Sequence, residues 1–321
     1  MLSIVDNREA VRSPAMTHLD FGYHPPAGDR GTERVDPATF LADLDRILAV
    51  AAPAFESVWI SDHFMTNDKY RLECWTLLTW IAARHPEPLL GTIVLANSYR
   101  HPPLLAKAAA SLQALSGGRL ILGYGAGWAG DEYRGYGYPF PPFRQRVEEM
   151  DEAIDLIRLL WQGGPVSFDG RFYRLEDAVC NPVPVPPPPI MIGGDGERFT
   201  LRSVAERADW WNTLNRPLDL LRRRVAILDE HCAAVGRDPS AIKRTIVLTV
   251  FLRRDGAEAR RLAGDRVDAE APVFAGDPAE LRDHLEQLAE IGFEHIQLVF
   301  ADFPELRDVE LFLSEVRPAF A

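Results

Sequence analysis

Two kinds of hydrophobic pattern alternate along the chain. Short runs rich in Val, Ile and Leu predict buried parallel strands, and the longer amphipathic runs between them predict helices. The predicted strands are Met16–Tyr23, Ser57–Ser61, Leu89–Asn97, Leu120–Gly125, Ile190–Gly193, Asp209–Thr213, Lys243–Leu252 and His295–Phe300. The predicted helices are Asp36–Ala51, Glu73–Arg84, Pro103–Leu115, Arg144–Trp161, Glu197–Arg207, Leu218–Val235, Pro278–Ile291 and Pro304–Val316. Each predicted strand is therefore followed by a helix.

Eight strand–helix pairs, at about 40 residues each in a chain of 321, are typical of a closed (β/α)8 TIM barrel. A doubly wound open sheet is the alternative, since the alternation alone does not show closure. We expect one domain, residues 1–321. Asp36 and Asp277 each precede a proline and predict helix starts, while Gly117 and Gly292 predict helix ends where a positive φ is needed.

Two segments exceed the simple repeat. Residues 163–189 form an insertion before the fifth strand, in which Asp169-Gly170 predicts a β-hairpin. The proline run 182–189 that follows is predicted to be extended. Residues 253–276 are polar and charged, and predict a loop with one helical turn. Since this loop follows the seventh strand, it is either a mobile cover for a site or a solvated surface loop.

Composition narrows the class of protein. The formal charge is −12, with 35 Lys and Arg against 47 Asp and Glu, which argues against nucleic acid or an anionic membrane surface as partner. No run of apolar residues is long enough to span a bilayer, and the first residues lack the pattern of a signal peptide. Cys74, Cys180 and Cys232 are odd in number and far apart, as expected for reduced thiols. We expect a cytoplasmic protein that binds a small molecule.

In a (β/α)8 barrel the reactive groups lie at the C-terminal ends of the strands. The polar, aromatic and glycine residues at those positions are Tyr23, His24, Asp62, His63, residues 97–101, residues 125–131, residues 193–196, Asn212 and Asp302. Their His, Asp and Glu residues lack metal-ligand spacing, so no metal site is predicted.

Two glycine-rich turns stand out among these positions. The turn at 123–130 fails the dinucleotide fingerprint because Trp128 stands where the third glycine should be. Its small residues either let a flat ligand approach the backbone or only permit a tight turn. The turn at 190–197 leads from a strand into a helix and predicts a phosphate site, with Arg198 nearby. The alternative is that its glycines serve strand-to-helix packing.

Asp62 and His63 come directly after the second strand. A histidine there can exchange a proton near neutral pH, and a carboxylate can fix its tautomer. Adjacent residues on an extended chain point to opposite sides, so a direct contact between the two is not implied. The alternative is a pair of hydrogen-bonded structural residues at the rim of the barrel.

The chain resembles the luciferase-like monooxygenase superfamily, and within it the F420-dependent oxidoreductases. The segments that carry the resemblance are Trp59–Phe64, Leu90–Leu95, His101–Lys107, Ser116–Trp128, Glu132–Gly137 and Pro188–Gly194. They occur in the order typical of the family. The resemblance implies a barrel with an insertion before strand five and a flavin-shaped cofactor across its C-terminal mouth. That cofactor is coenzyme F420, an 8-hydroxy-5-deazaflavin that transfers hydride, or in other branches FMN reduced by a partner reductase.

The resemblance also assigns site residues. It implies that Asp62 and His63 are an acid–histidine pair beside the cofactor. Our hypothesis is that His63 exchanges a proton with the substrate and that Asp62 orients the cofactor or His63. The resemblance further implies a cis peptide that supports the ring, a turn along the cofactor and a turn that holds the phosphate. The residues at these three places are, in order, Ile93 and Val94; Gly125, Ala126, Gly127 and Trp128; and Gly193 and Gly194.

Two positions depart from the pattern of the sugar-phosphate dehydrogenases of this family. Trp128 replaces a glutamate that donates a proton, and Asn67 stands near the place of a tryptophan that contacts substrate. With Tyr23 and Phe64 expected near Trp128, the departures favour a flatter and less charged substrate.

We therefore expect hydride transfer between F420 and a small organic substrate. One alternative is a two-component monooxygenase that uses reduced FMN and oxygen, and another is a non-catalytic flavin-binding protein. By analogy with the family, we expect a homodimer formed through helices near strands two to four.

Overall fold

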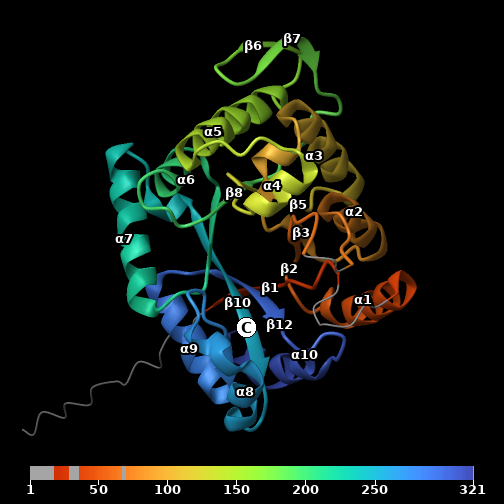
Figure 1. Cartoon of the computed structure of the whole chain (residues 1–321), viewed down its shortest axis with the longest axis vertical. Helices are drawn as coiled ribbons and strands as arrows, with labels where there is room; N and C mark the ends of the chain where they lie inside the picture. The colour runs from red at the N-terminus through yellow and green to blue at the C-terminus, as the bar shows by residue number, and fades with distance from the viewer. Residues whose placement is uncertain (1–17, 29–35, 67–69, 321) are drawn as a thin grey trace, which may run out of the picture.

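The computed structural model describes residues 18–28, 36–66 and 70–320. Eight parallel strands form a closed ring, because β1 pairs with both β2 and β12, and β9 pairs with β10 (Figure 1). In ring order they are β1 (Asp20–Tyr23), β2 (Ser57–Ile60), β3 (Leu89–Thr92), β5 (Leu120–Gly125), β8 (Ile190–Gly193), β9 (Trp210–Leu214), β10 (Lys243–Leu252) and β12 (His295–Phe300). The predicted TIM barrel is confirmed, and the open sheet is excluded. Met16, Thr17 and Asn67 lie outside the described residues.

A layer of helices surrounds the ring. These helices are α1 (Pro37–Ala51), α2 (Cys74–Arg84), α3 (Pro102–Ser116), α5 (Phe143–Leu160), α6 (Thr200–Arg207), α7 (Leu218–Ala234), α9 (Pro278–Ile291) and α10 (Arg307–Leu311). Short 3-10 and π turns are η1 (Asn97–Tyr99), η2 (Pro239–Ala241), η4 (Phe312–Val316) and η5 (Arg317–Ala319). Asp36 and Asp277 cap α1 and α9 as predicted, and Gly117 and Gly292 end α3 and α9 with positive φ.

Two connections contain elements that the hydrophobic pattern did not predict. A short helix, α4 (Gly130–Tyr136), follows β5 almost at once. The prediction of a loop with one helical turn over 253–276 was wrong. The segment contains α8 (Gly256–Ala263), the 3-10 turn η3 (Gly264–Asp268) and β11 (Phe274–Gly276), which pairs with β10. Arg260 of α8 forms an ion pair with Glu280 of α9.

The third barrel strand is interrupted. β3 ends at Thr92, and a separate two-residue strand, β4 (Leu95–Ala96), pairs with the end of β5. Between them the Ile93–Val94 peptide bond is cis, as the resemblance implied. The break turns the chain at the C-terminal mouth of the barrel, next to the ends of β5 and β8.

The insertion before the fifth barrel strand forms the predicted hairpin. β6 (Pro165–Asp169) and β7 (Arg174–Val179) pair antiparallel and project outward beyond α5 (Figure 1). The Glu152 side chain of α5 holds the hairpin loop, because its carboxylate accepts hydrogen bonds from the backbone amides of Arg171, Phe172 and Tyr173.

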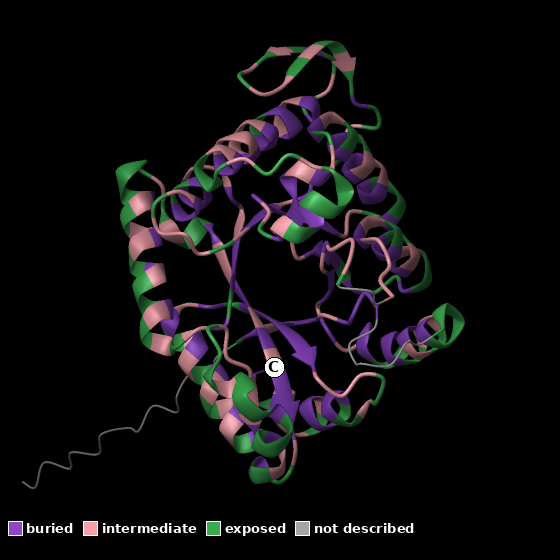
Figure 2. Ribbon diagram, in the orientation of Figure 1, coloured by how far each residue is buried: buried purple, intermediate pink, exposed green. Residues whose placement is uncertain are grey.

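The barrel strands are buried, and the helices are buried on their inner faces and exposed on their outer faces (Figure 2). The core therefore lies between the strand ring and the helix layer. All three cysteines are buried and free. Among the described residues, no helix has both the length and the apolar character needed to cross a membrane.

Candidate active site

One pocket at the C-terminal mouth of the barrel gathers the predicted site residues. Its volume is about 310 Å³, and it lies where β2, β3, β5 and β8 end. Its lining includes the ten residues that were assigned a catalytic or cofactor-binding role from the sequence: Asp62, His63, Ile93, Val94, Gly125, Ala126, Gly127, Trp128, Gly193 and Gly194. The structure thus brings together four segments that are up to about 130 residues apart in the chain. The roles of these residues stay predictions.

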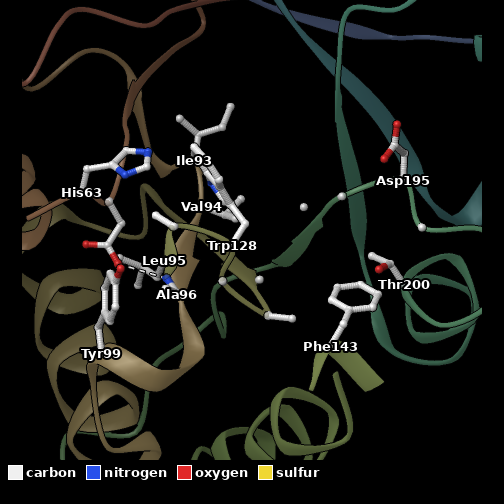
Figure 3. Close-up of a pocket in the computed structure, with 18 residues that line it drawn as sticks. His63, Ile93, Val94, Leu95, Ala96, Tyr99, Trp128, Phe143, Asp195 and Thr200 are labelled. Atoms are coloured by element: carbon white, nitrogen blue, oxygen red, sulfur yellow. Dashed lines mark hydrogen bonds between the residues drawn. The ribbon is translucent and has the colours of Figure 1, made fainter. Parts of the chain in front are cut away.

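Figure 3 shows how the labelled side chains surround the pocket. His63 and Tyr99 lie on one side, Asp195, Thr200 and Phe143 lie on the other, and Trp128 lies between them. Phe143 and Thr200 were missed by the sequence reasoning. They begin α5 and α6, and no pattern in the sequence distinguishes them from other helix starts.

His63 is held by a carboxylate that the sequence reasoning did not assign. Glu132 lies in α4, its side chain is 4% exposed, and its Oε1 is 2.6 Å from His63 Nδ1. Its Oε2 accepts hydrogen bonds from the backbone amide of Phe64 at 2.9 Å and from the Tyr99 hydroxyl at 3.2 Å. Because a carboxylate only accepts, the His63 proton is placed on Nδ1, which leaves Nε2 to exchange a proton with a ligand.

Asp62 has a different set of partners from His63. Its fully buried carboxylate accepts two hydrogen bonds from Arg100, at 2.8 and 2.9 Å, and one from the backbone amide of Ala96 at 3.0 Å. Arg100 also pairs with Glu73, which caps α2. Asp62 therefore anchors the short strand that follows the cis peptide. The two adjacent residues face separate partners, in agreement with the extended-chain argument.

Tyr99 donates a hydrogen bond to Glu132 and is buried beside it. Burial and the neighbouring Glu132 carboxylate raise the pKa of Tyr99 well above its usual value. The Tyr99 hydroxyl therefore stays protonated and keeps donating to Glu132 across the physiological range.

Glycine is required where the turns touch the pocket. Gly127 has a φ of 75°, and a Cβ there would lie 1.9 Å from the Tyr133 hydroxyl. A Cβ at Gly193 would lie 2.8 Å from the Val94 methyl groups. Two glycines therefore bring backbone, rather than side chain, to the pocket wall, which suits the close approach of a flat ligand.

We expect Gly127→Ala to weaken binding of the F420 that the resemblance implies at least tenfold, because the new methyl group both strains the backbone and overlaps the Tyr133 hydroxyl. Fluorescence titration of the cofactor measures this change. The matched control is Gly137→Ala, since Gly137 has a φ of 73° but nothing within 4 Å of the new Cβ. Adding Tyr133→Phe to Gly127→Ala should restore part of the affinity. Equal losses in the Gly127 and Gly137 variants would contradict the packing explanation.

The turn after β8 forms the opposite side of the pocket. Gly193, Gly194, Asp195 and Gly196 line it, and Thr200 begins α6 there, three residues later than predicted. Arg198 lies over the ring of Phe199, at 5.1 Å, and does not line the pocket.

The charge on this turn is balanced by an arginine from the loop after β9. Arg216 Nε lies 3.3 Å from Asp195 Oδ2, and its Nη1 donates to the Glu270 carbonyl at 2.8 Å. Asn215 also donates to the Pro272 carbonyl at 2.8 Å. The 253–276 segment is therefore tied to the side of the pocket that the turn after β8 forms.

The aromatic surface of the pocket differs from the expected one. Trp128 is 76% exposed, and its ring lies edge-on to the His63 ring with centroids 5.6 Å apart. The expectation that Tyr23 and Phe64 lie beside Trp128 was wrong. Tyr23 is buried against Phe55 and Phe300, because it faces the helix layer.

Phe64 packs among tyrosine side chains. It contacts Tyr99, Tyr136 and Tyr138 and does not line the pocket. Besides Trp128 and the buried Tyr99, Phe143 lines the pocket, and its side chain is 43% exposed.

The remaining candidates at the strand ends do not line the pocket. Asn212 is buried inside the barrel and donates to Thr245 and Gln297. Asn97 Oδ1 accepts a hydrogen bond from the Tyr124 hydroxyl at 2.6 Å, and Asn97 Nδ2 donates one to the Tyr173 hydroxyl of the insertion at 3.1 Å. His24 follows β1 and is partly buried. Within the described ranges, no group of three or more His, Cys, Asp and Glu side chains could hold a metal ion.

Asp302 has a structural partner rather than a place in the pocket. Its Oδ2 accepts the Asp308 amide at 2.9 Å, and burial raises its pKa to about 6. The folded state therefore binds this proton more tightly than the unfolded state, so stability is lost as pH rises from about 4 through 6.

We expect Asp302→Asn to stabilise the protein at pH 8 by about 1–2 kcal/mol, because the neutral amide keeps the acceptor without the buried charge. The gain should largely vanish near pH 4, and kcat should not change. Urea unfolding at the two pH values measures the difference. Loss of stability at pH 8, or of turnover, would show that the carboxylate itself is needed.

With this fold and this pocket, the chain belongs to the luciferase-like monooxygenase family, whose model matches residues 21–302. It is similar to an F420-dependent glucose-6-phosphate dehydrogenase of Kineococcus radiotolerans, at 34% identity over 72% of this chain and 69% of that one. It is also similar to an F420-dependent hydroxymycolic acid dehydrogenase of Mycobacterium tuberculosis, at 32% identity over 74% of this chain and 68% of that one.

A solved structure has the same fold. It is an F420-dependent secondary alcohol dehydrogenase in complex with an F420–acetone adduct, with a TM-score of 0.79 and 20% identity over 95% of this chain and all of that one. At this identity the likeness shows the fold alone.

Proposed function

We infer that this chain is an F420-dependent oxidoreductase that transfers a hydride between the deazaflavin and a small organic substrate. The observation that carries the inference is the convergence of four separate segments on one pocket at the barrel mouth. The names of the relatives support the cofactor, because both the sugar-phosphate and the hydroxymycolic acid dehydrogenases are F420-dependent.

The residues of the pocket fit a flat phosphorylated cofactor. The Ile93–Val94 peptide and the turn Gly125–Gly127 would hold the ring. A Cβ at Gly125 or Gly193 would overlap the Val94 side chain, so glycine at both positions lets the backbone lie close to this peptide. The turn Gly193–Gly196 would hold the phosphate, with the Asp195 charge balanced by Arg216. When bound, the deazaflavin supplies a ring carbon that accepts or donates hydride and does not activate oxygen.

His63 would exchange the proton that accompanies the hydride. Its Nδ1 is bound to Glu132, so Nε2 accepts a proton from a hydroxyl group or, once protonated, donates it to a carbonyl group. Asp62 would act as a positioning residue, because Arg100 and the Ala96 amide occupy its carboxylate.

Titration with F420 and with FMN tests the cofactor. We expect F420 to bind with micromolar or better affinity and FMN to bind much more weakly. Tight binding of FMN without binding of F420 would contradict the proposal and favour the two-component monooxygenase, for which oxygen consumption with reduced FMN and a partner reductase is the test. Cofactor that binds but is never reoxidised or reduced by a substrate would favour a non-catalytic binder.

We also propose a homodimer that works in the cytoplasm. Leu104 and Leu115 of α3 are exposed apolar side chains near the helices expected at the interface. Sedimentation equilibrium tests the assembly, and a monomer at micromolar concentration would contradict it.

A further inference from the structure

We propose that Trp128 and Phe143 form the substrate subsite, and that it selects an uncharged substrate with a flat or apolar group and rejects a phosphorylated one. The proposal rests on the proposed function, since it assumes that the cofactor fills the ring and phosphate positions of the same pocket. Its first support is the distribution of charge around that pocket.

Every ionisable side chain of the pocket already has a partner. Asp62 is bound by Arg100, His63 by Glu132, and Asp195 by Arg216. Among the described residues, neither arginine nor lysine lines the pocket. The cofactor phosphate would take the backbone amides of the Gly193–Gly196 turn, so a second phosphate on the substrate would find the Asp195 carboxylate and no lining cation.

The nearby arginines are not available to a second anion. Arg100 holds the fully buried carboxylate of Asp62 and also pairs with Glu73. Moving Arg100 to a substrate would leave a buried charge unpaired, which is strongly unfavourable. Arg216 likewise holds Asp195 and the Glu270 carbonyl. Losing Arg216 would make the cofactor's phosphate turn more negative, so it too is committed.

The free part of the pocket wall is aromatic. Trp128 exposes most of its indole although it lies in a pocket, and Phe143 presents a second ring from the start of α5 (Figure 3). A large aromatic surface left open at a concave site is typical of ligand binding. Because the Trp128 ring is edge-on to His63, a group packed on Trp128 would bring its neighbouring oxygen close to His63.

The reaction of such a substrate would balance with His63 of this chain as proton acceptor and F420, the proposed cofactor, as hydride acceptor. In an aryl carbinol, the C–H bond breaks and its electron pair leaves as hydride to oxidised F420. The hydroxyl proton goes to His63 Nε2, and a C=O double bond forms. The products are a ketone, reduced F420 and protonated His63, and the reverse reaction reduces the ketone.

Ligand pairs that differ by one anionic group test the proposal. After F420 titration has established cofactor binding, the F420-loaded protein is titrated with 1-phenylethanol, 4-(1-hydroxyethyl)benzoate, glucose and glucose 6-phosphate, using calorimetry and deazaflavin absorbance. We expect 1-phenylethanol to bind at least tenfold more tightly than the benzoate, and glucose 6-phosphate to bind no better than glucose. Failure of F420 to bind would instead contradict the proposed function.

Variants connect the selectivity to the subsite. Trp128→Ala should weaken 1-phenylethanol binding about tenfold, while Trp128→Phe should keep most of the binding, and F420 titration of both variants accounts for any change in cofactor binding. Leu262→Ala is the matched control, because Leu262 is an apolar side chain that is 45% exposed but lies on α8, away from the pocket. Tighter binding of glucose 6-phosphate than of glucose, no binding of 1-phenylethanol, or an unchanged Trp128→Ala variant would each overturn the proposal.

Discussion

Replacing His63 with alanine is expected to lower kcat for hydride transfer by about 10²–10⁴-fold, the usual contribution of a positioned proton-transfer group. F420 affinity should change little, because the ring and phosphate positions are formed by the cis peptide and the glycine turns rather than by His63. Steady-state turnover and fluorescence titration of the cofactor, measured on the same preparation, separate the two effects.

His101 offers a matched control for this variant. It is an exposed histidine at the start of α3, its side chain does not cap the helix, and it lies outside the pocket. His101→Ala should therefore keep full turnover. If His63→Ala kept kcat within a few-fold of the parent, or lost F420 binding instead of turnover, His63 would not be the proton-exchanging residue.

Replacing Glu132 is expected to have the second large effect. Glu132→Ala removes the acceptor of three donors, from His63, Phe64 and Tyr99, and should destabilise the protein by about 2–5 kcal/mol. Glu132→Gln keeps the volume, but its NH₂ group can face His63 Nδ1 only if the histidine proton moves to Nε2. We therefore expect kcat to fall about 10²-fold with little change in KM.

Nitrogen-15 NMR of the histidine rings distinguishes positioning from a general loss of structure. In the parent protein the His63 proton should be on Nδ1, and in Glu132→Gln on Nε2. Glu152→Gln is the control, since Glu152 also accepts three donors, but from the hairpin loop and with no histidine among them. An unchanged His63 tautomer in Glu132→Gln, or an equal fall in kcat in both variants, would contradict the assigned role.

Much of the fold could be predicted because it follows from local patterns. Buried parallel strands and amphipathic helices differ in hydrophobic period, and eight pairs in sequence leave few topologies other than the barrel. Because the reactive groups of such a barrel lie at the C-terminal ends of its strands, the sequence also predicts that Asp62, His63 and the glycine turns meet at one mouth of the barrel.

The partners of these residues could not be predicted in the same way. Glu132 reaches His63 only because α4 follows β5 closely, and that helix is too short for a clear period. Tyr23 was misplaced because a strand's last residue can face either the mouth or the helix layer, and the packing of Phe55 and Phe300 decides it. β11 was missed because three residues carry no distinct alternation.

A crystal structure of the protein with F420 tests the central claim most directly. We expect the deazaflavin ring to lie against Ile93–Val94 and the turn Gly125–Gly127, with its reactive carbon open toward His63 and Trp128, and the phosphate at Gly193–Gly196. Cofactor density outside this pocket, or a phosphate bound on the His63 side, would contradict the account.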